Sequence, residues 1–318
     1  MAAPLIPQEI YLLERYSSSD YFEKLVDAFA GCVTAGEDAL AKFMLKLPPD
    51  YRSRPLWLQP DATWGETVLP NLRSTLASLN RGLVQISGGD FNGLAFAGNV
   101  STDFAALARD YDDEWMSEPE SSEFDARMRL ARKLARNIFA TAQHQWQARL
   151  LSSQYQADTR GDLNAPPTWP IYRRVSAVQV ATGSAVPRSG AYLPDLEGSS
   201  AQFLINGHDA PQCAVPRQHP DPAVLSAAQD LFDTEWTLVE RVADASGAIP
   251  FTNDLDTVSN SLRCVAGDAC PKAGWWVTPA GEKGRRRFTQ GEIMPAFDGD
   301  YGRTIWQWDV EQSDRTSP

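Results

Sequence analysis

The sequence predicts an α+β protein in which an N-terminal helical bundle is followed by a C-terminal β-rich part with two repeated small β modules. Three observations lead to this fold class. Apolar residues recur at helical spacing through the first half of the chain. Beyond Gly161, proline-rich turns separate short apolar runs, a pattern typical of strands. Within that second half, the block at 179–192 recurs at 263–276.

The length and the change in pattern predict two domains. The chain has 318 residues, about twice a common domain size, and its 43% hydrophobic and 22% charged residues are typical of a folded protein. We place a helical domain at 1–160 and a β-rich domain at 161–318, with repeats at about 175–242 and 262–312.

Four helices are expected in the first domain. The spacing of apolar residues predicts them at 20–47, 65–84, from 101 to about 115, and 124–151. Ser19 and Asp20 are good N-cap types for the first helix, and Pro48 ends it. The proline-rich stretch that continues to Pro60 is interpreted as a connector.

The repeat aligns the two β modules residue by residue. QVATGSAVPRSGAY at 179–192 corresponds to RCVAGDACPKAGWW at 263–276, so Gly190 aligns with Gly274 and Tyr192 with Trp276. A second block keeps the same offset and aligns Pro211 with Pro295, and Trp236 then resembles Trp306 after a longer insertion. Val180 and Val186 align with Cys264 and Cys270. The fold therefore requires small apolar groups there and no disulfide, although the sequence leaves open whether one forms.

The second repeat is rich in tryptophan. Its structural motif consists of Gly274, Trp275, Trp276, Pro295, Trp306 and Trp308. Trp306 and Trp308 point to the same face if they lie on one strand. We interpret these side chains as the core of a small module, with a tryptophan-rich interface as the alternative.

The charge balance favours a cationic protein partner. With 29 basic and 41 acidic residues, the net charge of −12 disfavours nucleic acid and anionic membranes as partners. The acidic run 110–125 contains no basic residue. From it we select candidate partner-binding residues: Asp110, Asp112, Asp113, Glu114, Glu118 and Glu120. A solvated loop, or pairing of this run with the arginines at 285–287, is the alternative.

No pattern of catalytic residues is present, so we expect no enzyme activity, cofactor or metal. Phosphate-binding loops, nucleophile elbows and zinc-binding helix motifs are absent from the sequence. His208, Cys213 and His219 lie close together, but their spacing matches no standard zinc site. His144 is expected at a surface or boundary position.

The N-terminal segment predicts a cytoplasmic protein. It has no basic region followed by an uninterrupted apolar run, and Glu9 and Glu14 interrupt it early. No stretch approaches the roughly 18 apolar residues required to cross a membrane.

Several segments together resemble a known group of bacterial proteins. They are LLERYSSSDYFEKL, LPPDYRSRPL, RNIFATAQHQW and the terminal GWWVTPAGEKGRRRFTQGEIMPAFDGDYGRTIWQWD. The chain resembles polymorphic-toxin immunity proteins, families seventy-one and seventy-two, over nearly its whole length. The resemblance implies a protein that neutralises a toxin, often one delivered by type VI secretion, and it supplies no catalytic residues. The alternatives are a hydrolase or carbohydrate-binding protein with a tryptophan-rich surface, and a secretion-associated adaptor or chaperone.

Overall fold

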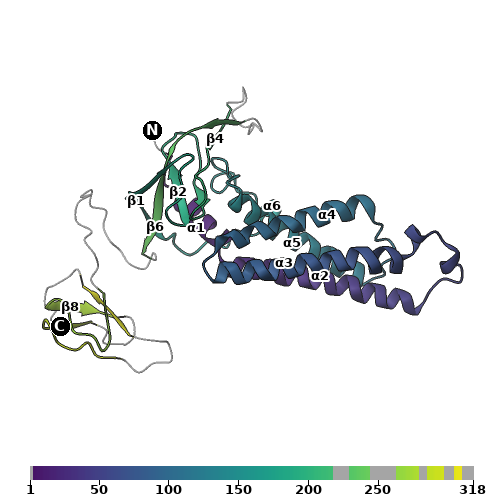
Figure 1. Ribbon diagram of the computed structural model, residues 1–318, viewed down its shortest axis with the longest axis horizontal. Helices are drawn as coiled ribbons and strands as arrows, with labels where there is room; N and C mark the ends of the chain where they lie inside the picture. Colours follow the sequence, from purple (N-terminus) through teal and green to yellow (C-terminus); the bar gives the residue numbers. More distant parts are fainter. Residues whose placement is uncertain (1–2, 218–228, 244–262, 279–284, 297–303, 310–318) are drawn as a thin grey trace. The chain divides into compact units, whose positions relative to one another are not determined.

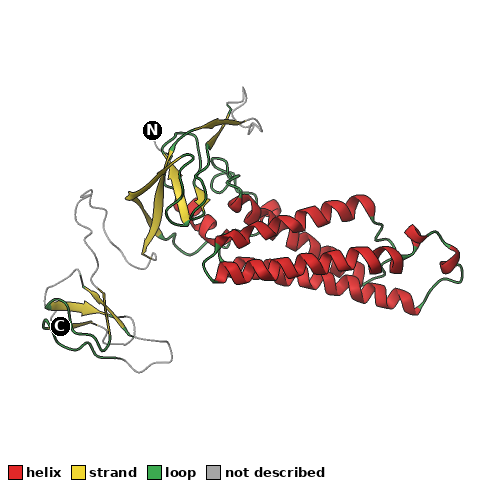
Figure 2. Ribbon diagram, viewed as in Figure 1, coloured by secondary structure: helices red, strands yellow, loops and turns green. Residues whose placement is uncertain are grey.

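The chain folds as an α+β protein, as the sequence predicts, with helices first and antiparallel strands after them (Figures 1 and 2). The computed structural model describes residues 3–217, 229–243, 263–278, 285–296 and 304–309. The chain divides into two compact units, Met1–Ala248 and Ile249–Pro318. Each unit is described by itself below.

The first unit contains a bundle whose helices alternate in direction. The helices of the described residues are α1 (Pro7–Tyr16), α2 (Ser19–Leu45), α3 (Leu69–Ser87), α4 (Gly98–Asp110), α5 (Glu120–Ala142) and the short α6 (Ala157–Arg160). Short helical turns η1 (Tyr51–Ser53), η2 (Leu56–Leu58), the π-helical η3 (Asp61–Val68) and η4 (Phe91–Ala97) connect them. Helix α1 and the π-helical segment are not predicted from the sequence.

Helix α2 begins and ends for local reasons. Ser18, one residue before the predicted caps, accepts a hydrogen bond from the backbone N–H of Tyr21 at 3.2 Å. The helix ends at Leu45, just before the two prolines at 48 and 49. It continues unbroken through Gly36, where an added Cβ would lie 3.1 Å from the Leu69 side chain. That glycine therefore allows helices α2 and α3 to approach closely.

The third predicted helix is too long. Helix α4 ends at Asp110, and Tyr111 already has extended backbone, so Trp115 lies in the following loop and not on the helix. Trp115 still packs against the bundle, which explains its apolar spacing. A residue can match the helical spacing of apolar residues although it lies in a loop that packs on the core.

The fourth predicted helix is also too long. Helix α5 ends at Ala142, because His144 adopts left-handed backbone with φ of 53°. Arg149, in the loop that follows, also has a positive φ, of 73°. Trp146 and Leu151 nevertheless lie in the core, where they are 1% and 0% exposed. The chain folds back on itself after α5, and the apolar spacing continues through that loop.

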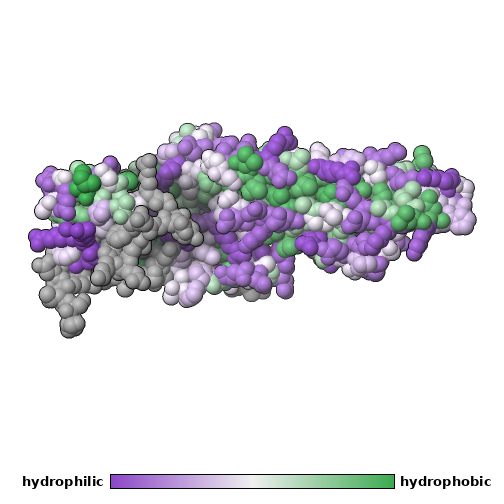
Figure 3. All heavy atoms as spheres, turned by 90° about the horizontal axis from the view of Figure 1, so that it is seen from below, coloured by the Kyte–Doolittle hydropathy of each residue, from purple (hydrophilic) through white to green (hydrophobic). Residues whose placement is uncertain are grey.

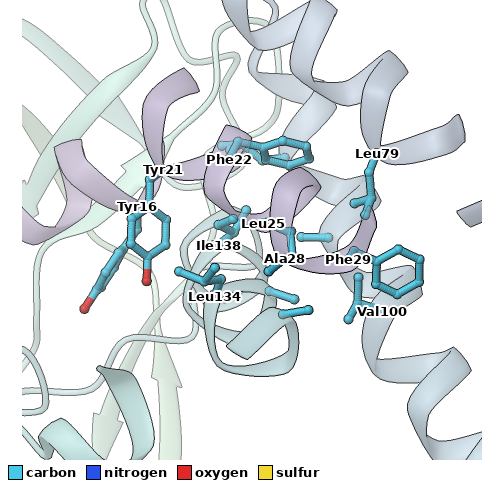
Figure 4. Close-up of a cluster of buried hydrophobic side chains, with 14 of the residues drawn as sticks. Tyr16, Tyr21, Phe22, Leu25, Ala28, Phe29, Leu79, Val100, Leu134 and Ile138 are labelled. Atoms are coloured by element: carbon cyan, nitrogen blue, oxygen red, sulfur yellow. The ribbon is translucent and has the colours of Figure 1, made fainter. Parts of the chain in front are cut away.

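The main core lies between the helices. Buried side chains of α2, α3, α4 and α5 meet there, among them Leu25, Phe29, Leu79, Val100 and Ile138 (Figure 4). The Tyr16 and Tyr21 rings lie at the end of this core nearest α1, with centroids 5.0 Å apart.

Each β module is a four-stranded antiparallel sheet. The first contains β1 (Ile171–Ala181), β2 (Gly190–Pro194), β3 (Gln202–Leu204) and β6 (Glu235–Ala243), in the order β1-β6-β2-β3. The second contains β7 (Arg263–Val265), β8 (Gly274–Val277), β9 (Arg285–Phe288) and β10 (Ile305–Trp308), in the order β7-β10-β8-β9. Strands β4 (Cys213–Pro216) and β5 (Gln229–Phe232) pair with each other in the first unit.

The strand register confirms the duplication. The two sheets have the same strand order and equivalent residue pairs. In the first module the pairs are Gly190–Leu204, Val180–Trp236 and Tyr192–Leu238. Their equivalents in the second module, in the same order, are Gly274–Phe288, Cys264–Trp306 and Trp276–Trp308. The sequence offset therefore corresponds to one topology used twice.

A tryptophan anchors each module in the same way. Trp236 and Trp306 are fully buried, and their indole N–H groups donate to the backbone oxygens of Pro211 and Pro295 at 2.9 and 2.8 Å. The core of the second module also contains Cys264 and Cys270, and all four cysteines of the chain are free thiols. The structural motif of the second repeat thus contributes mainly to this core.

The boundary between compact units differs from the predicted domain boundary. Residue 160 marks the change from helix to strand, but the first unit continues to Ala248. The reason is that one face of the first sheet packs on the helices. Its apolar residues Ala191, Leu193 and Phe203 belong to the same core cluster as the bundle.

A buried carboxylate joins α1 to the loops beside that sheet. Glu9 is only 3% exposed and accepts hydrogen bonds from the hydroxyls of Ser152 at 2.7 Å and Ser200 at 3.4 Å. Burial raises the pKa of Glu9, and these hydrogen bonds oppose the increase. The sequence pattern around Glu9 gives no sign that this carboxylate is buried.

Replacing Glu9 should change how stability depends on pH. Because its pKa is raised in the native state, the native protein keeps a proton that the unfolded chain has already released. The free energy of unfolding therefore falls as pH rises from the unfolded pKa through the native one. Glu9→Gln should remove this contribution. Urea unfolding followed by helical circular dichroism at several pH values tests it, with exposed Glu23→Gln as control. Equal pH slopes for Glu9→Gln and wild type would contradict the expectation.

Candidate partner-binding surface

Two loops meet at the end of the helical bundle farthest from the first β module. Helix α2 runs to this end at Leu45 and α4 reaches it at Asp110, so the connections 46–60 and 111–119 lie there together (Figure 1). The proline-rich connector and the acidic run, about fifty residues apart in sequence, therefore form one surface. We call it the distal surface.

Exposed carboxylates form one part of the distal surface. Asp110, Asp112, Asp113 and Glu114 are all exposed. Asp110 forms an ion pair with Arg109 at 2.6 Å, and the hydrogen bonds from that guanidinium lower the pKa of Asp110. Asp112 accepts a hydrogen bond from the backbone N–H of Glu114 at 2.9 Å. These residues could contact a partner directly.

The last two candidate residues have different surroundings. Glu118 is exposed and accepts a 3.4 Å hydrogen bond from the backbone N–H of Ser122. Glu120 is buried at the start of α5 and forms an ion pair with Lys42 of α2, which lowers the pKa of its carboxyl. Glu120 thus links two helices, so we place the partner-binding prediction on the exposed carboxylates of the run.

Large apolar side chains form the other part of the distal surface. Trp57 is 73% exposed, Leu56 69% and Leu58 50%, and Leu45 at the end of α2 is 83% exposed. Apolar side chains are visible at this end of the bundle in the space-filling view of Figure 3. Such a cluster on a single chain is typical of a surface that binds another protein. The sequence signal was a tryptophan between leucines in a segment that has neither helical nor strand periodicity.

A cavity of about 860 Å³ opens between these two parts. Its lining combines aromatic, aliphatic and acidic groups. The residues are Phe43, Asp50, Arg54, Trp57, Leu58, Pro60, Thr63, Asp110, Tyr111, Asp112, Glu114 and Trp115. Residues from α2, both connections and α4 thus contribute to one hollow.

Packed aromatic rings hold the acidic loop in place. The Trp115 ring meets Phe43 at 5.6 Å and Trp64 at 5.4 Å between centroids, and Trp64 in turn meets Phe124 at 5.4 Å. The Trp64 indole N–H also donates to the backbone oxygen of Asp112 at 2.8 Å. The carboxylates are therefore presented by a loop that is anchored to the bundle core.

The histidines lie elsewhere. His144 sits in a partly buried position, and burial lowers its pKa to about 4, so it is neutral near pH 7. His208 contacts the Asn92 side chain at 2.6 Å, Cys213 is buried, and His219 lies outside the described residues. Among the described residues, no three histidine, cysteine or acidic side chains are grouped as metal ligands.

Two of the arginines at 285–287 have partners in the second unit. Arg285 forms an ion pair with Asp309, and its guanidinium lies 4.3 Å from the centre of the Trp275 ring. Arg286 lies 5.6 Å from the centre of the Phe288 ring. These contacts provide a local role for the two arginines.

The sequence matches no family model, no curated protein and no solved structure. In the described part of the chain, no helix combines the length and the apolar character required to cross a membrane. The features that bear on function are therefore the residues and geometry of the distal surface.

Proposed function

We propose that this protein is an immunity protein that binds and neutralises a cognate antibacterial toxin, delivered by type VI secretion, in the cytoplasm. The observation that supports it most is the distal surface, where Trp57 is 73% exposed beside a row of carboxylates. The resemblance of the sequence to polymorphic-toxin immunity proteins supplies the kind of partner.

The composition of the distal surface suits tight protein binding. Tryptophan is enriched among the residues that dominate binding energy at interfaces, and Trp57 is exposed between two exposed leucines, Leu56 and Leu58. Exposed carboxylates around it attract a cationic partner and accelerate association. The net charge of −12 acts in the same direction.

The carbohydrate-binding alternative has less support. It requires tryptophans of the β modules to form an accessible platform. Trp236, Trp276 and Trp306 are each 0% exposed, so they fill module cores instead.

Co-expression tests the proposal. The gene beside the one for this protein should encode a toxin domain, and expressing both should restore growth of cells that the toxin alone arrests. The two purified proteins should coelute as a stable complex. Protection at strongly substoichiometric amounts, or a chemically altered toxin, would show catalysis and contradict neutralisation by binding.

A further inference from the structure

We infer that the cavity of the distal surface receives a basic side chain, an arginine first of all, from a segment of the partner protein. The inference deepens the proposed function, since the partner would be the toxin. The chemistry of the occupant, however, follows from the cavity itself.

Two carboxylates at the cavity have no cationic partner among the described residues. Asp112 and Glu114 are exposed, and neither takes part in any ion pair of the described chain. Asp112 accepts only the backbone N–H of Glu114. A guanidinium or ammonium group would pair with carboxylates already held in place by the anchored loop.

The one basic residue in the cavity lining already pairs with a carboxylate of the same lining. Arg54 donates two hydrogen bonds to Asp50, both at 3.0 Å, from Nε and Nη2. This leaves an excess of negative charge at the cavity. The carboxyl end of helix α4 lies beside it at Asp110, and the free carbonyl groups of a helix end add to the negative potential. A phosphate or an acidic segment would be repelled here.

Aromatic walls favour arginine over lysine. The guanidinium group is planar and stacks on aromatic rings while its N–H groups bind carboxylates. Trp57 presents an exposed ring, and Tyr111 and Trp115 line the same cavity. The fold already uses this type of contact, since the Arg52 guanidinium lies 5.0 Å from the centre of the Tyr51 ring.

The size of the cavity indicates that a peptide segment accompanies the side chain. Its volume of about 860 Å³ exceeds the requirement of one side chain and lies in the range of sites for larger ligands.

Two matched peptides test the inference without the toxin. The first is an acetylated and amidated pentapeptide with arginine between two leucines, and the second replaces the arginine by citrulline, which has the same shape without the charge. Titrated into the full-length protein at low salt, the arginine peptide should bind at least about tenfold more tightly.

Variants locate the binding site. Asp112→Asn with Glu114→Gln should reduce affinity for the arginine peptide by at least about tenfold and remove the preference over citrulline. Glu23→Gln with Asp27→Asn removes the same charge from exposed positions on α2 and should leave binding unchanged. Helical circular dichroism of each variant confirms folding.

The outcomes separate this inference from the proposed function. Equal affinity for the two peptides, or equal binding by the Asp112 and Glu114 variant, overturns the inference even if the protein coelutes with the toxin. Discrimination between the peptides supports the inference even if the protein fails to neutralise the toxin, in which case the proposed function fails.

Discussion

Trp306→Ala should unfold the second β module. Trp306 is 0% exposed, its ring meets Phe288 at 4.8 Å, and its indole N–H donates to the Pro295 oxygen at 2.8 Å. Truncating a buried tryptophan costs about 3–5 kcal/mol. The partly buried Pro295 oxygen also loses this donor, which adds to that cost. The described core of this module consists of few side chains, so the loss should exceed what the module can sustain.

Hydrogen exchange measures this effect within the intact chain. In the variant, amides of strands β7 to β10 should lose protection, while those of the helical bundle keep theirs because the bundle belongs to the other compact unit. Trp57→Ala is the matched control, since it removes the same side chain from a position that is 73% exposed. It should change stability by less than about 0.5 kcal/mol. Unchanged protection in Trp306→Ala would contradict the assigned core.

Trp57→Ala should strongly weaken binding of the toxin. If the distal surface is the interface, Trp57 lies near its centre between Leu56 and Leu58. Truncating such a residue costs at least about 2 kcal/mol, which corresponds to about a thirtyfold increase in Kd. Most of the loss should appear in the dissociation rate, because the carboxylates that steer association remain.

Exposed apolar residues elsewhere in the first unit provide the comparison. Leu231 and Phe232 on β5 are 60% and 45% exposed, and their replacement by alanine should leave toxin affinity within about twofold. A biosensor with immobilised toxin measures all three variants. Wild-type affinity for Trp57→Ala, or a comparable loss for the β5 variants, would assign the toxin to another face.

Local pattern was sufficient for much of the bundle. Apolar periodicity located the helices, since a helix that packs on one side must repeat its apolar residues every turn. The same periodicity extended two predicted helices too far, from Asp110 to about Trp115 and from Ala142 through Trp146 to residue 151. Trp115 and Trp146 both pack on the bundle core, but each belongs to a loop that follows a helix. The spacing of apolar residues does not distinguish a buried helical residue from a buried loop residue.

The candidate site was only half visible in the sequence. The acidic run from Asp110 to Glu114 was recognisable from its composition. Its apolar neighbour at 56–58 was interpreted as part of a connector, because nothing in a single sequence shows which loops meet at one end of a bundle. The burial of Glu120 beside Lys42 also depends on the packing of α5 on α2, residues 78 positions apart.

The sequence by itself determined that one β module occurs twice, because the side chains that fill the module core recur in register. Only the tertiary structure showed what lies on the sheet face that points away from the module core in each copy. In the first copy, the cross-strand pair Ala191 and Phe203 is buried against the helices. The equivalent pair in the second copy is Trp275 and exposed Arg287. Each copy has a core cluster of its own. A face must be apolar to join another core, and this face makes the first copy part of the same compact unit as the bundle.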